Sequence, residues 1–153
     1  MIRPATAADL PSLTDTIRRA WIIAYGQILP FDVIQRWACE DWSGNQAAEQ
    51  WPEITVFEHE GRAVGMMRTE GPDISDLFVH PSCHRRGIGT ALIRDAEARV
   101  ARDGYDTAEV GVVDGNLPAL AFYTAQGYAR IRVEGETVPG EEAAILILAK
   151  RLR

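Results

Sequence analysis

The sequence predicts a mixed α/β fold in which helices cover both faces of one sheet. Short apolar and β-branched runs alternate with longer segments whose apolar residues recur at helical spacing. The resulting order of hairpin, strand, helix, strand, helix, strand and strand suits a mixed sheet. A chain of 153 residues can build a self-sufficient core, so we expect one domain over residues 1–153.

The N-terminal part is predicted to contain one strand and two helices. Residues 2–5 form the strand, and residues 8–25 form the first helix. The apolar residues that recur at helical spacing in this helix are Leu10, Leu13, Ile17, Trp21 and Ala24. Pro30 begins the second helix, where its fixed φ and missing N–H are tolerated.

A hairpin, a strand and a helix are expected in the centre of the chain. Residues 54–59 and 63–69 form the hairpin, because Glu60-Gly61 between them is a turn signal. The apolar run 74–79 is the next strand, and the helix at 87–103 follows it after a short loop.

Three strands and one helix complete the expected fold. The β-branched run 107–113 is a strand, and the helix after it ends at Gly127, a candidate left-handed cap. The last two strands are predicted at residues 128–133 and 143–148.

The loop between the strand at 74–79 and the helix at 87–103 carries the most specific functional signal. A strand–loop–helix corner directs backbone N–H groups and the positive end of a helix dipole to one point, which suits a phosphate. Gly87 and Gly89 allow a ligand to approach the backbone closely. The ATP/GTP loop is excluded because the chain has no Gly-Lys pair. The dinucleotide fingerprint is excluded because Leu92 stands where its third glycine belongs.

Two segments resemble the signature of the GCN5-related N-acetyltransferases, the GNAT family. The loop resembles the family's acyl-CoA loop, Gln/Arg-x-x-Gly-x-Gly/Ala, although His84 stands at the Gln/Arg position. Residues 116–128, Asn-Leu-Pro-Ala-Leu-Ala-Phe-Tyr-Thr-Ala-Gln-Gly-Tyr, resemble the family's Asn-x-x-Ala-x-x-Phe-Tyr-x-x-x-Gly-Phe/Tyr segment at every fixed position. Residues 2–10 resemble its opening strand and first helix start. The sequence is therefore identified as a member of this family.

The resemblance implies a GNAT-like fold and an acetyl-CoA site. The expected sheet is mixed, mostly antiparallel and flanked by about four helices. Its central strands splay apart, and the pantetheine arm of acetyl-CoA lies between them. The main-chain groups of Phe78 and Val79 would then pair with pantetheine. The amide near Val79 would donate to the oxygen on which negative charge develops.

The resemblance assigns the rest of the CoA site to the loop and to Asn116. The loop residues expected to surround the pyrophosphate are His84, Arg85, Arg86, Gly87, Ile88, Gly89 and Thr90. The side chains of Arg85 and Arg86 either reach a phosphate or remain solvated. Asn116 either caps the helix that follows it or bonds the pantetheine.

The resemblance places Tyr123 at the general-acid position, where its phenol would protonate the leaving thiolate. The alternative role of Tyr123 is packing. A general base must also accept the amine proton, and the candidates are Asp73, Asp76 and Glu109. Asp73 and Asp76 are three residues apart and would face opposite sides of a regular strand, but the family commonly has a bulge there. Asp73 matches the position of the glutamate that family members often use slightly better than Asp76 does. His80 is a weaker candidate, because His-Pro is more typical of a strand end.

Composition excludes several other functions. A net charge of −6 argues against nucleic-acid binding, and no apolar stretch is long enough to cross a membrane. Cys39 and Cys83 have no metal-ligand spacing, so no metal is expected. The start of the chain has no secretory signal pattern, and we expect a cytoplasmic protein. Residues 32–60 carry seven acidic side chains against Arg36 alone, either as a solvated surface or as the wall of a cleft for cationic amines.

The acceptor amine cannot be named from the sequence and is either a small molecule or a protein. Aromatic residues concentrated in the first two helices and their loop are candidates for its binding by cation–π contact, and core packing is the alternative. They are Trp21, Tyr25, Trp37 and Trp42. A non-catalytic acyl-CoA sensor is the alternative function, which the presence of Tyr123 and Asn116 argues against. A homodimer is possible.

Overall fold

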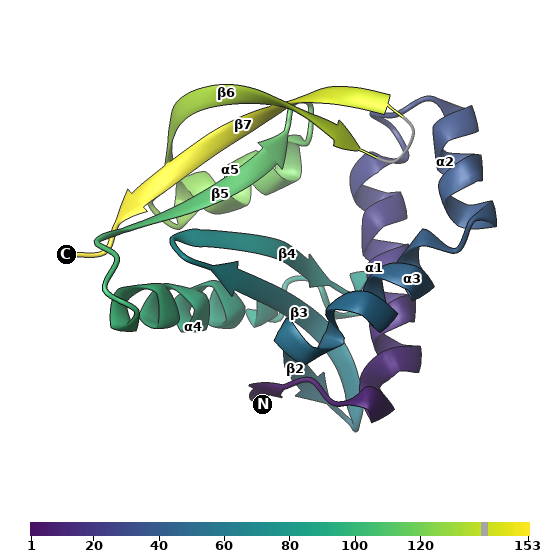
Figure 1. Cartoon of the computed structure of the whole chain (residues 1–153), viewed down its shortest axis with the longest axis horizontal. Helices are drawn as coiled ribbons and strands as arrows, with labels where there is room; N and C mark the ends of the chain where they lie inside the picture. Colours follow the sequence, from purple (N-terminus) through teal and green to yellow (C-terminus); the bar gives the residue numbers. More distant parts are fainter. Residues whose placement is uncertain (139–140) are drawn as a thin grey trace.

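The computed structural model describes residues 1–138 and 141–153, which form one seven-stranded sheet with helices on both faces (Figure 1). The strand order is β1-β2-β3-β4-β5-β7-β6, and only β4 and β5 pair in parallel. The strands are β1 (Ile2–Pro4), β2 (Thr55–His59), β3 (Arg62–Glu70), β4 (Asp73–Val79), β5 (Thr107–Val113), β6 (Ala129–Val138) and β7 (Glu141–Arg151). The α-helices are α1 (Leu10–Tyr25), α2 (Phe31–Cys39), α3 (Trp42–Gln50), α4 (Ile88–Arg102) and α5 (Leu117–Ala125). The mixed, mostly antiparallel sheet is confirmed.

Helix α3 was not expected from the sequence, and the last two strands are longer than predicted. Helix α3 contains Ser43, Gly44 and Asn45, which are poor helix formers, so helical periodicity did not reveal it. Its start is stabilised by the Asp41 side chain, which accepts a hydrogen bond from the Gly44 N–H. Strands β6 and β7 are longer than expected because β6 pairs with residues 141–149 of β7, and the end of β7 continues the sheet beside β5.

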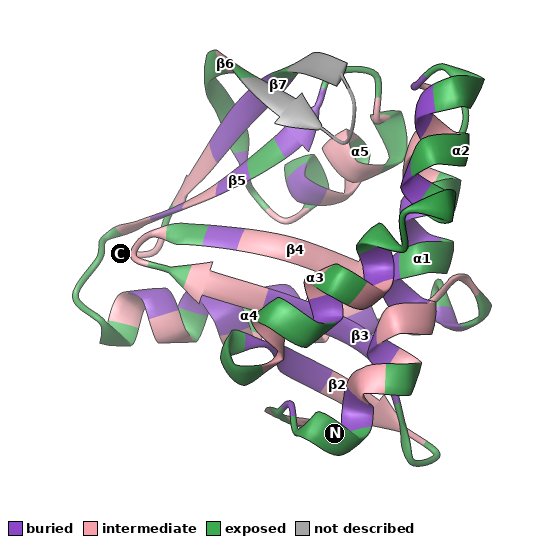
Figure 2. Cartoon of the chain, turned by 45° about the vertical axis from the view of Figure 1, so that its right-hand side comes forward, coloured by how far each residue is buried: buried purple, intermediate pink, exposed green. Residues whose placement is uncertain are grey.

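Each face of the sheet has its own core. Helix α4 buries Leu92, Ile93, Ala96 and Val100 against one face, and these side chains are fully inaccessible. On the opposite face, α1 packs against β2 and β3, and buried residues concentrate on these elements (Figure 2). Strand β5 shows the alternation between the two faces, because Val112 packs with α4 whereas Val113 packs with Ile145 and Ile147 of β7 on the α1 face.

The two halves of the sheet separate between β4 and β5. These strands share only the pairs Asp73↔Glu109 and Ile74↔Val110. Beyond them, β4 pairs only with β3 and β5 only with β7 among the described residues, and the strands diverge (Figure 1). The expected splay of the central strands is therefore confirmed.

A β-bulge in β4 determines which side chains of this strand lie on the same face of the sheet. The β3–β4 register shifts next to Arg68, and Asp76 has a φ of 54°, which is uncommon for a residue other than glycine. Ile74 packs on the α4 face, and so does Val79, although regular alternation would separate them. The bulge therefore puts Asp73 and Asp76 on the same face of the sheet, towards α1.

A partly buried ion pair joins α4 to β7 and gives a stability prediction. The Lys150 ammonium group bonds both carboxylate oxygens of Glu97 at 2.9 Å, and Glu97 is 9% exposed. Lys150→Met should lower the free energy of unfolding by about 1–3 kcal/mol, because a nearly buried carboxylate loses its cationic partner and keeps only the Tyr128 hydroxyl at 3.4 Å. Urea denaturation measures this loss. The double variant Glu97→Leu/Lys150→Met should recover part of it, and a single variant as stable as the native chain would contradict the prediction.

Candidate active site

A cleft of about 1410 Å³ opens where β4 and β5 diverge, and α1, α5, β6 and β7 complete its walls. Most of the residues predicted from the sequence line this cleft. They are Asp73, Asp76, Phe78, Val79, His84, Arg85, Gly87, Ile88, Gly89, Thr90, Glu109, Asn116 and Tyr123. Arg86 is the exception, because it lines a separate hollow with Asp15 and His80. His80 therefore lies away from the cleft that contains the other base candidates.

The start of α4 presents free backbone donors to the cleft. Gly87 precedes the helix with a φ of 76°, and no side chain caps the helix start. The N–H groups of Ile88, Gly89 and Thr90 belong to the first turn and have no partner within the helix. A Cβ atom placed on Gly87 would have no atom within 4 Å, so the space in front of these donors is open. This corner has the geometry of an anion site.

Two other predicted side chains make contacts within the protein. The His84 ring donates from Nε2 to the Val79 carbonyl oxygen at 3.0 Å, which ties the loop to β4. Asn116 caps α5, because its Oδ1 accepts the Ala119 N–H at 3.3 Å. Capping was one of the two roles expected for Asn116, and the residue also lines the cleft.

The edge of β4 that faces the gap is defined by its register with β3. The His80 N–H donates to the Val64 carbonyl at 2.7 Å, so the main-chain groups of His80 face β3. In an antiparallel pair every second residue faces the partner strand in this way, and Phe78 lies two residues before His80. The main-chain groups of Phe78 therefore also face β3. Those of Leu77 and Val79 then face the gap. The main-chain groups of Phe78 therefore do not face the gap, where the pantetheine expectation placed them, whereas those of Leu77, which sequence reasoning did not select, do face it. The Phe78 side chain still lines the cleft.

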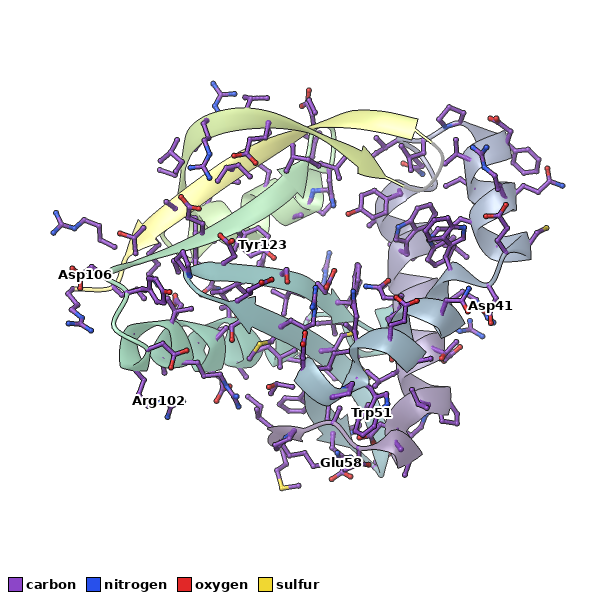
Figure 3. All side chains as sticks on the ribbon, viewed as in Figure 1. Asp41, Trp51, Glu58, Arg102, Asp106 and Tyr123 are labelled. Atoms are coloured by element: carbon purple, nitrogen blue, oxygen red, sulfur yellow. The ribbon has the colours of Figure 1, made fainter. Side chains whose placement is uncertain are left out.

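Tyr123 of α5 projects beside the gap between β4 and β5 (Figure 3). The residue is 8% exposed and packs edge-on against Phe122 and Tyr128, with ring centroids 5.2 and 5.7 Å away. Its hydroxyl has no hydrogen-bond partner among the described residues. Burial raises the pKa of Tyr123, and the neighbouring Tyr25 and Asp76 raise this pKa further. The site thus holds a neutral phenol whose O–H bond is unused.

Asp76 is the carboxylate associated with Tyr123. The Arg68 Nε donates to Asp76 at 2.9 Å, and the same guanidinium group bonds Glu53 at 3.1 Å. Burial raises the pKa of Tyr25, and so does the negative charge of Asp76. Asp76 therefore acts electrostatically on both phenols, one from α1 and one from α5.

Asp73 and Glu109 are two neighbouring carboxyl groups, because they lie opposite each other at the first of the two paired positions of β4 and β5. Arg132 of β6 donates to both oxygens of Glu109, at 3.0 and 3.2 Å, and this contact lowers the pKa of Glu109. Burial raises the pKa of Asp73, and the adjacent Glu109 raises it further. The arginine partners were not found from the sequence because they depend on strand register.

All four aromatic residues line the cleft, but two of them are almost fully buried. Trp21 and Trp37 stack at 4.0 Å and are only 5% and 2% exposed, so they mainly pack in the core behind the cleft wall. Tyr25 packs against Trp21 at 5.1 Å and, like the partly exposed Trp42, contributes to the cleft wall.

The acidic residues of segment 32–60 lie outside the cleft, as the surface interpretation expected. Three of them pair with arginines, namely Asp41 with Arg18, Glu53 with Arg68, and Glu58 with Arg3. The acidic groups of the cleft come from β4, β5 and β6 instead.

The described residues contain neither a candidate metal site nor a candidate membrane span. No group of three or more His, Cys, Asp or Glu side chains within them could hold a metal ion. No described helix is long and apolar enough to span a membrane.

Comparison with known proteins identifies the family. The sequence pattern of the Acetyltransferase (GNAT) family matches residues 10–128. The peptidyl-lysine N-acetyltransferase YiaC of Escherichia coli is 30% identical over 135 residues, which cover 84% of this chain and 82% of that protein. A GCN5-related N-acetyltransferase from Rhodopseudomonas palustris has a TM-score of 0.84 at 22% identity, covering 99% of this chain and 94% of the other. The PaiA N-acetyltransferase of Thermoplasma acidophilum, solved with coenzyme A, has a TM-score of 0.73 at 20% identity, with 99% and 98% covered. The chain therefore belongs to the GNAT family of acetyltransferases.

Proposed function

We propose that the protein transfers an acetyl group from acetyl-CoA to a primary amine by direct attack in a ternary complex. One observation carries the proposal: three features line the same cleft. They are the uncapped N-terminus of α4, the edge of β4 that does not pair with β5, and the nearly buried phenol of Tyr123. The name of the E. coli relative and the coenzyme A bound to a similar structure support this choice of donor and acceptor.

Acetyl-CoA binding is assigned to the loop and to the edge of β4. The N–H groups of Ile88, Gly89 and Thr90 bind the pyrophosphate, where the helix dipole favours negative charge. Thr90 Oγ1 accepts a hydrogen bond from Gln126 at 3.2 Å, which leaves its own O–H free to donate. Arg85 faces the same cleft and adds a positive charge. Pantetheine lies along β4, and the thioester reaches the bulge.

Acyl transfer then uses groups on both sides of the gap. The amine nitrogen attacks the thioester carbonyl carbon, and the Leu77 or Val79 N–H donates to the oxygen that becomes negative. When the C–S bond breaks, the sulfur takes a proton from Tyr123. The raised pKa of Tyr123 keeps this proton in place until the thiolate forms.

Asp76 is the preferred general base. Asp76 lines the cleft and directly precedes Leu77, whose main-chain groups face the gap in which the thioester is placed. Both carboxylates accept a hydrogen bond from an arginine, but Arg68 bonds only one oxygen of Asp76. Arg132 bonds both oxygens of Glu109 and lowers the pKa of that group, so Glu109 is the poorer base. Asp76 accepts the proton that the attacking amine loses and returns it to solvent, and Tyr123 takes back a proton from solvent to replace the one given to the sulfur.

The proposal is tested by binding and turnover measurements on the purified protein. Calorimetry with acetyl-CoA measures donor binding, and a panel of primary amines added to the complex is followed by release of free thiol. Binding with thiol release for one class of amine is the expected result. Binding without release from any amine would favour the acyl-CoA sensor, and absence of binding would reject the assignment of the loop.

A further inference from the structure

The hollow beside the cleft contains a chain of hydrogen bonds that joins a hydroxyl group to a carboxylate. It has a volume of about 660 Å³ and lies between α1, the β2–β3 turn and the loop that follows β4. The Ser82 hydroxyl oxygen lies 2.8 Å from Nδ1 of His80, and Nε2 of the same ring lies 3.0 Å from the Asp15 carboxylate. All three side chains line the hollow.

The hydrogen bonds define the direction in which a proton can move. The Ser82 N–H donates to Nδ1 of His80 at 3.2 Å, so Nδ1 carries no proton and also accepts from the hydroxyl. Nε2 then carries the ring proton and donates it to Asp15. Burial opposes the ionisation of Asp15, but hydrogen bonds from Arg19 and His80 outweigh it and lower the pKa of Asp15. A hydroxyl bonded to an imidazole that a carboxylate orients is the arrangement of an activated nucleophile.

We propose that Ser82 and His80, positioned by Asp15, form a second catalytic site, which hydrolyses carboxylic esters that carry a negative charge. The Ser82 oxygen attacks the ester carbonyl carbon, and Nδ1 of His80 takes the hydroxyl proton. When the C–O bond to the alcohol breaks, the alcohol leaves with this proton and the acyl group remains on Ser82. Water then attacks the acyl carbon and gives a proton to His80, which returns it to Ser82 as the carboxylic acid leaves.

The same proton transfer provides a donor for the oxygen that becomes negative. Once Nδ1 of His80 is protonated, it no longer accepts the Ser82 N–H. This N–H belongs to the attacking residue and turns to the negative oxygen of the intermediate. Arg86 adds a positive charge, because it lines the hollow and has no hydrogen-bond or ion-pair partner in the described part of the chain.

The charges around the hollow favour an anionic substrate. Its lining contains three arginines and two carboxylates, namely Arg19, Arg62, Arg86, Asp15 and Glu60. Asp15 is already bonded by Arg19 at 2.8 Å and by Arg62 at 3.4 Å. The cleft has the opposite balance, with two arginines and four carboxylates in its lining. A negatively charged ester is therefore attracted to the hollow, and a protonated amine to the cleft.

The test compares hydrolysis of 4-acetoxybenzoate with that of its methyl ester, without acetyl-CoA and after correction for the rate in buffer. The native chain should prefer the anionic ester in kcat/KM by about tenfold, the effect of one charged hydrogen bond. Ser82→Ala should lower kcat/KM for this ester by about 100-fold or more and keep the melting transition. Ser75→Ala is the matched control, because it removes the same atom from a serine that lines the cleft, and it should leave hydrolysis unchanged.

Covalent labelling tests the activation of Ser82 without turnover. A fluorophosphonate, which bonds to activated serines, should label Ser82 of the native chain, and mass spectrometry of the peptides locates the label. Asp15→Asn should slow this labelling and lower kcat for the anionic ester by about tenfold or more. Asp15→Glu should recover part of both, because it restores a carboxylate to the ring.

Three results would overturn the proposal. They are hydrolysis by the native chain at the rate in buffer, unchanged hydrolysis in Ser82→Ala, and absence of the label from Ser82. If Ser82→Ala lost its melting transition, labelling of the native chain would decide the question. Hydrolysis is measured without acetyl-CoA, so failure of this site and failure of the proposed acetyl transfer are recorded separately.

Discussion

Tyr123→Phe should lower kcat for acetyl transfer by about 100-fold or more, the usual contribution of a positioned acid, and leave the affinity for acetyl-CoA within about twofold. The substitution removes only the hydroxyl oxygen. The ring keeps its edge contacts with Phe122 and Tyr128, so the packing of α5 should be preserved. The native hydroxyl has no protein partner among the described residues, and its loss leaves no donor or acceptor unpaired in the fold.

Tyr128→Phe is the matched control for this measurement. Tyr128 is the neighbouring phenol, but its hydroxyl donates to Glu97 at 3.4 Å on the α4 face and does not line the cleft. Its removal should cost stability without a comparable loss of kcat. If Tyr123→Phe turned over as fast as the native chain, the tyrosine would be a packing residue and another group would have to protonate the thiolate.

The pH dependence of the activity of the native chain is a second test of the role of Tyr123. An ordinary phenol ionises near pH 10, and burial raises the pKa of Tyr123 above this value. The acid form is present below the raised pKa and would be lost only above it. The activity should therefore not fall between about pH 7 and 10 through loss of this proton.

The parts of the site that depend on residues close together in the chain could be predicted from the sequence. The position of Gly87 before α4 and that of Asn116 before α5 are set by residues close in the chain, where loop and cap chemistry act. The splay of the central strands was expected from the resemblance, and β4 and β5 indeed share only two residue pairs.

The remaining parts depend on strand register and could not be predicted. A one-residue shift between β3 and β4 brings Asp73 and Asp76 to the same face, and the sequence pattern alone does not fix such a bulge. The contact of Arg132 with Glu109 spans β6 and β5, between which β7 lies. Asp76 and Glu109 were candidates for the same role, and only their different arginine partners separate them.

Gly87→Trp should reduce the affinity for acetyl-CoA by about 100-fold or more, which calorimetry would record as absence of binding. The open space in front of the α4 start is where the indole would project, and the pyrophosphate needs the same space. Hydrogen bonds to a charged group contribute about 1.5–3 kcal/mol each, so the loss of two backbone donors is enough for this effect.

Backbone strain at position 87 is the competing explanation for a loss of acetyl-CoA affinity in Gly87→Trp. The variant Gly61→Trp is the control for this strain. Gly61 has a φ of 75°, against 76° for Gly87, and a Cβ atom there also meets no atom within 4 Å. It lies in the β2–β3 turn, away from the cleft, so its substitution imposes the same strain without obstructing the helix start. If both variants lost acetyl-CoA binding and thermal stability together, the loss would reflect unfolding. Loss in Gly87→Trp alone, with a retained melting transition, would place the pyrophosphate at the N-terminus of α4.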